Sequence, residues 1–214
     1  MGTHGRCRQK GLTLAEVLIA ASVGVIITGM LIAVWIALTG SWTVTARGSE
    51  ARDFARDSVA RMSREIRDME PAVGEPSAIS MAEADCIRFT TTFNVSGNQS
   101  VSTTPVLTEY KYEPGTGDEQ GVLRWSRDTN GSGVIDDEDR DRIVARNVLN
   151  NTSQPMFVYT YLDSAAQSHT SSSVPTAELS TIQVVDVRVI VDMQPGRAPK
   201  PMDLTTTVQL RNQQ

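Results

Sequence analysis

The chain has 214 residues, a formal net charge of -5 at pH 7 and a sequence pI near 5.1. This length accommodates one domain with a sizeable core and an appended element, and it is short for two full domains. Nucleic acid is not the expected partner, because phosphate backbones are bound by clustered Lys and Arg side chains.

Residues 12–39 form an apolar stretch whose only charged residue is Glu16. As an α-helix, its uncharged part spans roughly 33 Å, which is enough for a hydrocarbon core of about 30 Å. A cleavable secretory signal has a shorter apolar region of about 7 to 15 residues. Arg6, Arg8 and Lys10 precede the stretch, and the positive-inside tendency keeps such residues in the cytoplasm. We therefore expect one transmembrane helix over 12–39, with the rest of the chain on the opposite side.

The helix is predicted to continue over 40–70, because no proline interrupts this segment. Four apolar residues fall three or four positions apart and form one stripe, which indicates an amphipathic helix. Asp57 and Arg61 are spaced as an i,i+4 ion pair on the polar side, and Arg64 and Asp68 have the same spacing. The stripe covers about two heptads, short of a typical coiled coil, so we expect it to pack on the chain's own sheet. It consists of Val59, Met62, Ile66 and Met69.

Pro71, Gly74 and Pro76 are expected to end the helix, and from Cys86 onward the pattern changes to the period of two that is typical of β-strands. Over 181–193 and 203–211, apolar residues alternate with polar ones, as expected for strands with one buried face. No helical pattern separates the strands, so the predicted fold class is α+β, with an antiparallel sheet packed on the amphipathic helix. Residues 94–105 and 164–177 are rich in Ser and Thr and are expected to be exposed loops. The predicted strands are 86–93, 106–113, 120–126, 142–149, 155–162, 181–193 and 203–211.

The segment KGLTLAE, Lys10 to Glu16, resembles the processing site of the type IV prepilin and pseudopilin family. In that family a basic leader ends in Gly, cleavage follows this Gly, and Glu is the fifth residue of the mature helix. Gly11 and Glu16 match these positions, so the resemblance implies a cleaved leader over 1–11 and a mature chain that begins at Leu12. It also implies that prepilin peptidase methylates the Leu12 amine, and that Glu16 pairs with the amine of a neighbouring subunit.

Glu16 is unusual in its own right, because an ionisable group at membrane depth costs about 2.5 to 3.5 kcal/mol on insertion scales. The alternative interpretation is an ordinary signal anchor with a chance interfacial Glu. Two features depart from the family pattern: Leu12 replaces the usual Phe, and the membrane segment lacks the proline that many pilins carry midway. Gly24 and Gly29 can loosen the helix in part instead.

The resemblance implies a pilin-like fold and a structural subunit rather than an enzyme. The size and the closing strands look like the W-type minor pilins or the J-type minor pseudopilins of type II secretion. Such a subunit initiates or caps a periplasmic filament. Its implied partners are prepilin peptidase, the inner-membrane assembly platform and other minor pilins or pseudopilins. The β domain, residues 71–214, is then periplasmic and the chain is embedded in the bacterial inner membrane. The alternative is a membrane-anchored adhesin or binding module with an extracytoplasmic β domain.

Residues 128–139, DTNGSGVIDDED, resemble the calcium loops of EF-hand and dockerin modules. Those loops place oxygen ligands at positions 1, 3, 5, 7, 9 and 12, and a Gly at position 6 permits a sharp turn. Gly133 takes the sixth position here. The alternative is an acidic hairpin turn, which Asn-Gly and Ser-Gly favour. We expect a structural calcium site whose ligands are Asp128, Asn130, Ser132, the carbonyl of Val134, Asp136 and Asp139.

The sequence contains no enzyme constellation, since it has neither a Gly-x-Ser-x-Gly elbow nor a phosphate loop. The only histidines are His4 and His169. No second His, Cys or carboxylate cluster flanks His169, so we expect a solvated loop residue there. Cys7 belongs to the predicted leader, so no internal disulfide can form in the mature chain. The remaining Cys86, at a strand start, is expected to be a small core residue rather than a nucleophile.

Overall fold

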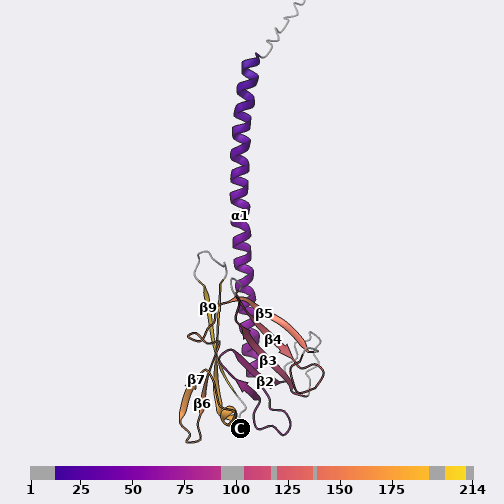
Figure 1. Cartoon of the computed structure of the whole chain (residues 1–214), viewed down its shortest axis with the longest axis vertical. Coiled ribbons are helices and arrows are strands. Elements are labelled where there is room, and N and C mark those ends of the chain that lie inside the picture. Colours follow the sequence, from indigo (N-terminus) through magenta and orange to yellow (C-terminus); the bar gives the residue numbers. More distant parts are fainter. Residues whose placement is uncertain (1–12, 93–103, 117–119, 137–138, 193–200, 211–214) are drawn as a thin grey trace, which may run out of the picture. The chain divides into compact units, whose positions relative to one another are not determined.

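The protein is described by a computed structural model that covers residues 13–92, 104–116, 120–136, 139–192 and 201–210, without the side chains of 40–51 and 140. The chain forms two compact units, Met1–Ala46 and Arg47–Gln214. The elements are one long helix, nine strands and one 3-10 helix within the described residues (Figure 1). They are α1 (Leu14–Arg67), β1 (Ile79–Ala82), β2 (Cys86–Thr91), β3 (Val106–Glu113), β4 (Gly121–Arg127), β5 (Arg140–Val148), β6 (Phe157–Leu162), β7 (Ser168–Ser171), η1 (Thr176–Thr181), β8 (Ile182–Val191) and β9 (Met202–Gln209).

In the second unit, the C-terminal part of α1 packs on the sheet through the predicted apolar stripe. The four stripe residues are buried and belong to one hydrophobic core with the inward faces of the strands. Each fully buried side chain of this kind contributes about 1.5 to 3 kcal/mol relative to an exposed one. The helix ends at Arg67, shortly before Pro71, and Gly74 then adopts a left-handed φ of 93°. The predicted α+β class, a long helix and an antiparallel sheet, is confirmed.

The sheet is a curled antiparallel arrangement in two parts. Strands β1 to β5 follow one another as a meander, each paired with the next. In the second part β8 lies between β9 and β6, and β7 pairs with β6. Alternate residues of β8, among them Val185, Val187 and Val189, are fully buried, as the sequence predicted. The two parts are joined where β5 meets β8, and a single residue pair, Val148 and Val191, forms this ladder.

A buried asparagine extends this short junction. Asn150 is 3% exposed, and its Oδ1 accepts the backbone N–H of Ile190 at 3.0 Å. Its Nδ2 donates to the carbonyl of Arg188 at 2.8 Å and to the carbonyl of Gln154 at 3.2 Å. A side-chain amide carries one acceptor and one donor group, so it can replace a backbone peptide beside a strand. Asn150 therefore continues the pairing to β8 beyond the end of β5.

Two i,i+4 ion pairs predicted for α1 are wrong. Arg61 pairs with Glu65, with 2.9 Å between Nε and Oε1, and both residues are buried. The Nε of Arg64 donates to the carbonyl of Ala60 at 3.3 Å, and no ion pair with Asp68 forms. Arg61 and Glu65 lie at the border of the buried stripe. Their side chains contact the sheet there instead of water. The spacing rule describes an isolated helix surface and does not include this tertiary contact.

The carboxylate of Glu65 is held by aromatic side chains of the sheet. Its Oε2 accepts hydrogen bonds from the Tyr110 hydroxyl at 2.8 Å and from the Trp125 Nε1 at 3.1 Å. The Arg61 guanidinium stacks over the Trp125 ring at 4.2 Å from the centroid. Burial, and secondly the negative charge of Glu65, raise the pKa of Tyr110 well above its usual range. These four residues form a polar cluster inside an otherwise apolar helix–sheet interface.

The structure also contains elements that the strand pattern did not predict. Strand β1 precedes the first predicted strand, and β7 and the start of η1 lie inside the segment 164–177 that was expected to be an exposed loop. The segment is mostly exposed, as expected, but it is not a loop throughout, because hydrogen bonds to β6 order a polar strand there. The other predicted loop, 94–105, lies mostly outside the described residues. Cys86 is buried as predicted, and burial raises its pKa to about 12.

Candidate functional sites: the N-terminal helix and an acidic loop

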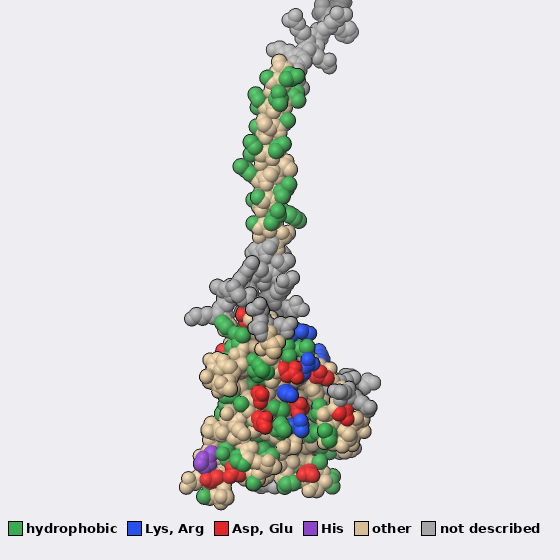
Figure 2. All heavy atoms as spheres, viewed as in Figure 1, with side chains coloured by type: hydrophobic (Ala, Val, Ile, Leu, Met, Phe, Trp, Pro, Cys, Tyr) green, Lys and Arg blue, Asp and Glu red, His purple; other side chains and the backbone are tan. Residues whose placement is uncertain are grey.

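The first unit consists of the apolar half of α1. Leu14–Thr39 is long and apolar enough to cross a membrane, and within the described residues no other helix is. Its hydrophobic side chains are exposed along the whole segment (Figure 2). Its polar side chains bond to the helix itself: the hydroxyls of Ser22, Thr28 and Thr39 donate to carbonyls three or four residues earlier, at 2.8 to 2.9 Å. Such internal bonds satisfy polar groups where water is absent.

Glu16 closes the N-terminal turn of this helix. Its Oε2 accepts the backbone N–H and the hydroxyl of Thr13, both at 2.9 Å, and its own N–H donates to the Thr13 Oγ1 at 3.3 Å. This reciprocal arrangement is a capping box, in which two otherwise unpaired donors of the first turn are satisfied. The carboxylate is thus fixed at the positive end of the helix dipole. Gly11 and Leu12, the predicted processing residues, lie outside the described residues.

The role of Thr13 was not predicted from the sequence. The signal was present, because Thr13 and Glu16 are spaced as the Thr-x-x-Glu pattern that marks a capping box before an apolar run. Thr13 positions the carboxylate of Glu16 and leaves Oε1 without a hydrogen bond from the described residues. A cation that approached this helix end could bind that oxygen.

The acidic loop joins β4 to β5 and is ordered by its own backbone. Asp128, which is 5% exposed, accepts backbone N–H groups on both carboxylate oxygens, from Gly131 and Gly133 at 2.7 Å each. Gly131 and Gly133 both have φ of 76°, a left-handed conformation that glycine adopts without strain. Gly133 is the sixth residue of the loop, and its N–H donates to Asp128, the first residue. The sharp turn predicted at the sixth position is therefore present.

The end of the loop is held in the same way. Asp139 accepts the N–H of Thr129 at 2.8 Å and the N–H of Asp136 at 2.9 Å, one on each oxygen. The hydrogen bond from Asp136, and secondly that from Thr129, lowers the pKa of Asp139 below its usual range. Ser132 donates its hydroxyl to the Val134 carbonyl at 2.9 Å. The six predicted calcium ligands are therefore folded into one loop. Within the described residues, however, no three side chains of the His, Cys, Asp or Glu type converge as a metal group.

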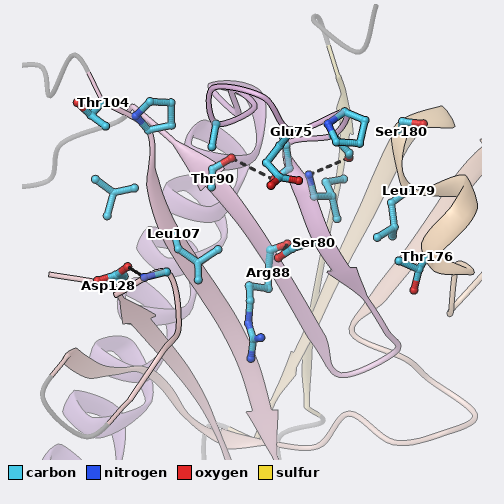
Figure 3. A pocket seen from close by; sticks show the side chains of 18 of the residues that line it. Glu75, Ser80, Arg88, Thr90, Thr104, Leu107, Asp128, Thr176, Leu179 and Ser180 are labelled. Atoms are coloured by element: carbon cyan, nitrogen blue, oxygen red, sulfur yellow. Dashed lines mark hydrogen bonds between the residues drawn. The ribbon is translucent and has the colours of Figure 1, made fainter. Parts of the chain in front are cut away.

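A hollow of about 940 Å³ lies beside this loop, over β1, β2 and β3 (Figure 3). Asp128 and Leu107 border one side, and Thr176 and Leu179 of η1 border the other. Most lining side chains are small, hydroxylic or apolar. Arg88 also lines the hollow, and its guanidinium is paired with Glu109 at 2.5 Å. The described lining offers no nucleophile with a neighbouring base, so the hollow shows no arrangement for catalysis.

His169 lies in a strand beside a turn and not in the predicted loop, but its side chain is exposed. It is a residue of β7, and its Nε2 is 2.8 Å from the Oδ2 of Asp163 across the β6–β7 turn. Asp163 also accepts the N–H groups of Ala165 and Gln167. The backbone bond from Gln167 and then the His169 side chain lower the pKa of Asp163. Asp163 is half-buried, and its bond to His169 closes the turn.

A long apolar N-terminal helix followed by an antiparallel sheet is a layout consistent with a pilin-like fold and with a single-pass membrane anchor. Residues 6–32 match the family described as the prokaryotic N-terminal methylation motif. This match supports a type IV prepilin-like family, whose members are structural subunits processed by a peptidase and assembled with pilus components. No curated protein matches the chain.

Proposed function

We propose that the chain is a minor pilin or pseudopilin, a subunit that initiates or caps a periplasmic type IV pilus or type II secretion pseudopilus. The observation that carries the proposal is the methylation motif at residues 6–32, which runs directly into the apolar helix Leu14–Thr39. Glu16 is the only charged residue of that helix segment, and its capped position at the helix end is suited to meet a neighbour's amine. The β domain then lies in the periplasm.

The processing step gives the first prediction. Co-expression with prepilin peptidase should yield a mature chain that begins at N-methylated Leu12, measured by mass spectrometry of the N-terminal peptide. Gly11→Val should leave the leader attached, because the bulky side chain occupies the cleaved position. Gly5→Val, a matched change elsewhere in the leader, should be processed normally. A mature terminus at Met1, or one beyond residue 36, would contradict the proposal.

The initiating or capping role needs a separate experiment. A subunit that starts filaments is required in few copies, so its loss should lower the number of filaments while the amount of major subunit in the membrane stays unchanged. Filaments counted by electron microscopy in a deletion strain measure this effect. Two results together would contradict this role: a normal number of filaments in the deletion strain, and this chain found along the whole filament in the parent strain. The chain would then be an ordinary structural subunit.

We also propose that the loop 128–139 binds one structural calcium ion. The support is the ligand spacing together with the left-handed turn at Gly133 and its bond to Asp128. The ligands would be Asp128, Asn130, Ser132, the Val134 carbonyl, Asp136 and Asp139. Calcium is bound by six to eight oxygens. Three carboxylates in one short loop repel one another without a cation, so a bound ion would stabilise the folded state.

Thermal unfolding with and without calcium tests this site. At a concentration about 100 times Kd, binding to the folded state alone contributes about 2.7 kcal/mol, which shifts Tm by several degrees. Magnesium should have a much smaller effect, because it prefers a smaller octahedral site. Asp136→Asn should reduce the calcium shift, and it is a milder change than Asp128→Ala, which also removes backbone hydrogen bonds. Glu75→Gln, an exposed change outside the loop, is the matched control. If millimolar calcium left Tm unchanged, the loop would be an acidic turn and not a calcium site.

A further inference from the structure

Strand β9 forms an edge of the sheet that no described part of the chain covers. It pairs with β8 along all eight of its residues, and no described strand forms a ladder with its other side. The two ends of the main strand order differ from it. Strand β1 lies beside η1, where the Val174 N–H donates to the Ala82 carbonyl at 3.0 Å, and β7 is a short strand of four residues.

The pairing with β8 fixes which backbone groups of β9 are open. The N–H of Leu210 donates to the Gln183 carbonyl at 2.9 Å, so the even-numbered residues of β9 direct their N–H and C=O groups toward β8. These directions alternate along an antiparallel strand. The odd-numbered residues therefore direct both groups to the other side, where no described backbone group bonds to them. These residues are Asp203, Thr205, Thr207 and Gln209.

Strand β9 also lacks the features that usually protect an edge strand, which are Pro, Lys, a bulge or a short length. Its sequence, MDLTTTVQ, contains no Pro, Lys or Arg, and its register with β8 runs without a shift. Its single charged residue is paired within the sheet, because Asp203 lies 2.5 Å from the Arg188 guanidinium. An unprotected edge with open backbone groups is a template for an added strand.

The side chains of β8 and β9 define the strand that fits. On the core side, Leu204 is half-buried and packs against the hydrophobic core, so apolar residues of an added strand would extend this row. On the other face, the two strands carry Asp186 and Asp203 against one cation, Arg188, which leaves a net negative charge. We propose that β9 binds an extended segment of a partner protein as an additional antiparallel strand. This segment has apolar residues at alternate positions and polar or basic residues between them.

The charge of this face decides between a partner protein and a second copy of the chain. The β9 strand of a second copy would bring the same net negative charge, and like charges placed beside each other are disfavoured. A segment with basic residues complements the face instead. Backbone hydrogen bonds would supply the affinity, and the alternating side chains the specificity. This contact requires neither filament assembly nor calcium.

Binding of a synthetic peptide to the full chain in phosphatidylcholine nanodiscs tests the edge. The probe is a fluorescent peptide of sequence TVKVTVKV, which alternates apolar with polar or basic residues. It should bind saturably to the chain and not to empty nanodiscs. A TVEVTVEV peptide should bind at least about fivefold more weakly, because its carboxylates meet the negative face. Absence of saturable binding of the TVKVTVKV peptide would overturn the proposal.

The variant Thr205→Pro tests whether the peptide uses the open backbone groups. Proline removes one N–H on the open side and leaves the bonds to β8 in place, so β9 should remain paired, as edge strands tolerate proline there. The affinity for TVKVTVKV should fall at least about tenfold, because a donor is lost and the ring occupies the peptide's place. Thr205→Val keeps the N–H and should bind as the parent does. Equal affinity of the Thr205→Pro chain and the parent would overturn the proposal.

Hydrogen exchange of the unmodified chain locates the peptide without any variant. Bound TVKVTVKV should slow exchange of the odd-numbered amides of β9, while the even-numbered amides, already bonded to β8, should change little. Mass spectrometry with fragmentation to single residues measures this pattern. Protection elsewhere in place of β9 would overturn the proposal, even if Thr205→Pro failed to fold. A dimer of the chain that forms without peptide and is abolished by Thr205→Pro would assign the edge to a second copy and would also overturn it.

Discussion

At the scale of single residues, the polar cluster around Glu65 shows how a charge is tolerated in the helix–sheet interface. Its carboxylate is 1% exposed and accepts bonds from Arg61, Tyr110 and Trp125. A buried charge that loses its partner costs far more than the intact pair contributes. The cluster therefore makes the interface sensitive to substitution of either charged residue.

We expect Glu65→Ala to lower the free energy of unfolding by about 3 to 5 kcal/mol, because Arg61 would remain buried without its carboxylate. Urea unfolding of the full chain in detergent measures this loss. Glu70→Ala, an exposed change just beyond the helix, should stay within about 0.5 kcal/mol of the parent. If the two variants had the same free energy of unfolding, the Glu65 carboxylate would not stabilise the helix–sheet interface as expected.

The pair between Asp163 and His169 predicts a pH dependence. The pKa of Asp163 is lowered in the folded state, so its contribution to stability is present above the unfolded pKa, near 3.8. That contribution is lost as the pH falls through the folded pKa. Asp163→Asn should therefore flatten the loss of stability below about pH 4, compared by urea unfolding at several pH values. Asp57→Asn, whose carboxylate has no described partner, should keep the parent's profile.

At the scale of elements, strands with one apolar face could be predicted and polar ones could not. The alternation in β8 and β9 predicted both their position and their buried face. Strand β7, with the sequence SHTS, has no apolar side chain and is defined by its hydrogen bonds to β6. A period-two pattern reports burial of one face, and β7 is mostly exposed. Strand β7 is formed by pairing with β6, a separate segment of the chain, and a pattern within one segment does not report such pairing.

Strand β4 begins with a close approach to β3 at Gly121. A Cβ atom there would lie 2.4 Å from the Tyr112 Cε2 and 2.9 Å from the Glu113 carbonyl oxygen. The backbone oxygen cannot move as a flexible side chain can, so Gly121→Ala should destabilise the sheet by about 1 to 3 kcal/mol. Gly24→Ala is the matched control, because nothing lies within 4 Å of its added methyl. Equal unfolding midpoints would show that the hairpin relaxes at no cost.

At the scale of the whole molecule, the matched methylation motif lies in the first unit and the hydrophobic core in the second. The processing segment could be predicted because its residues are contiguous and their spacing carries the chemistry. The structure adds the hydrogen bonds between Thr13 and Glu16, while the roles of Gly11, Leu12 and Glu16 stay predictions. The six loop residues at 128–139 likewise share one loop, while calcium binding stays a proposal. The Arg61–Glu65 cluster could not be foreseen, because it depends on β3 and β4.

We expect Glu16→Ala to separate membrane insertion from assembly. The variant makes the span more apolar, so insertion should be normal, measured by alkaline extraction of membranes. It also removes the carboxylate that Thr13 positions, so incorporation into filaments should fall strongly. Thr13→Val should have a weaker effect of the same sign, because the carboxylate remains but loses its fixed position. Normal incorporation of the Glu16→Ala chain would contradict the proposed pairing with a neighbour's amine.

The junction at Asn150 has a consequence for the order of folding. Strands β1 to β5 are connected as consecutive hairpins, so their contacts are close in sequence and form without large loop-closure costs. The bond between Asn150 and Ile190 joins residues 40 positions apart, and it requires both sheet parts to be in place. Pulsed hydrogen exchange during refolding should therefore protect the amide of Trp125 before that of Ile190. Asn150→Asp, which replaces the donating amide group by an acceptor, should delay the second step and leave the first unchanged.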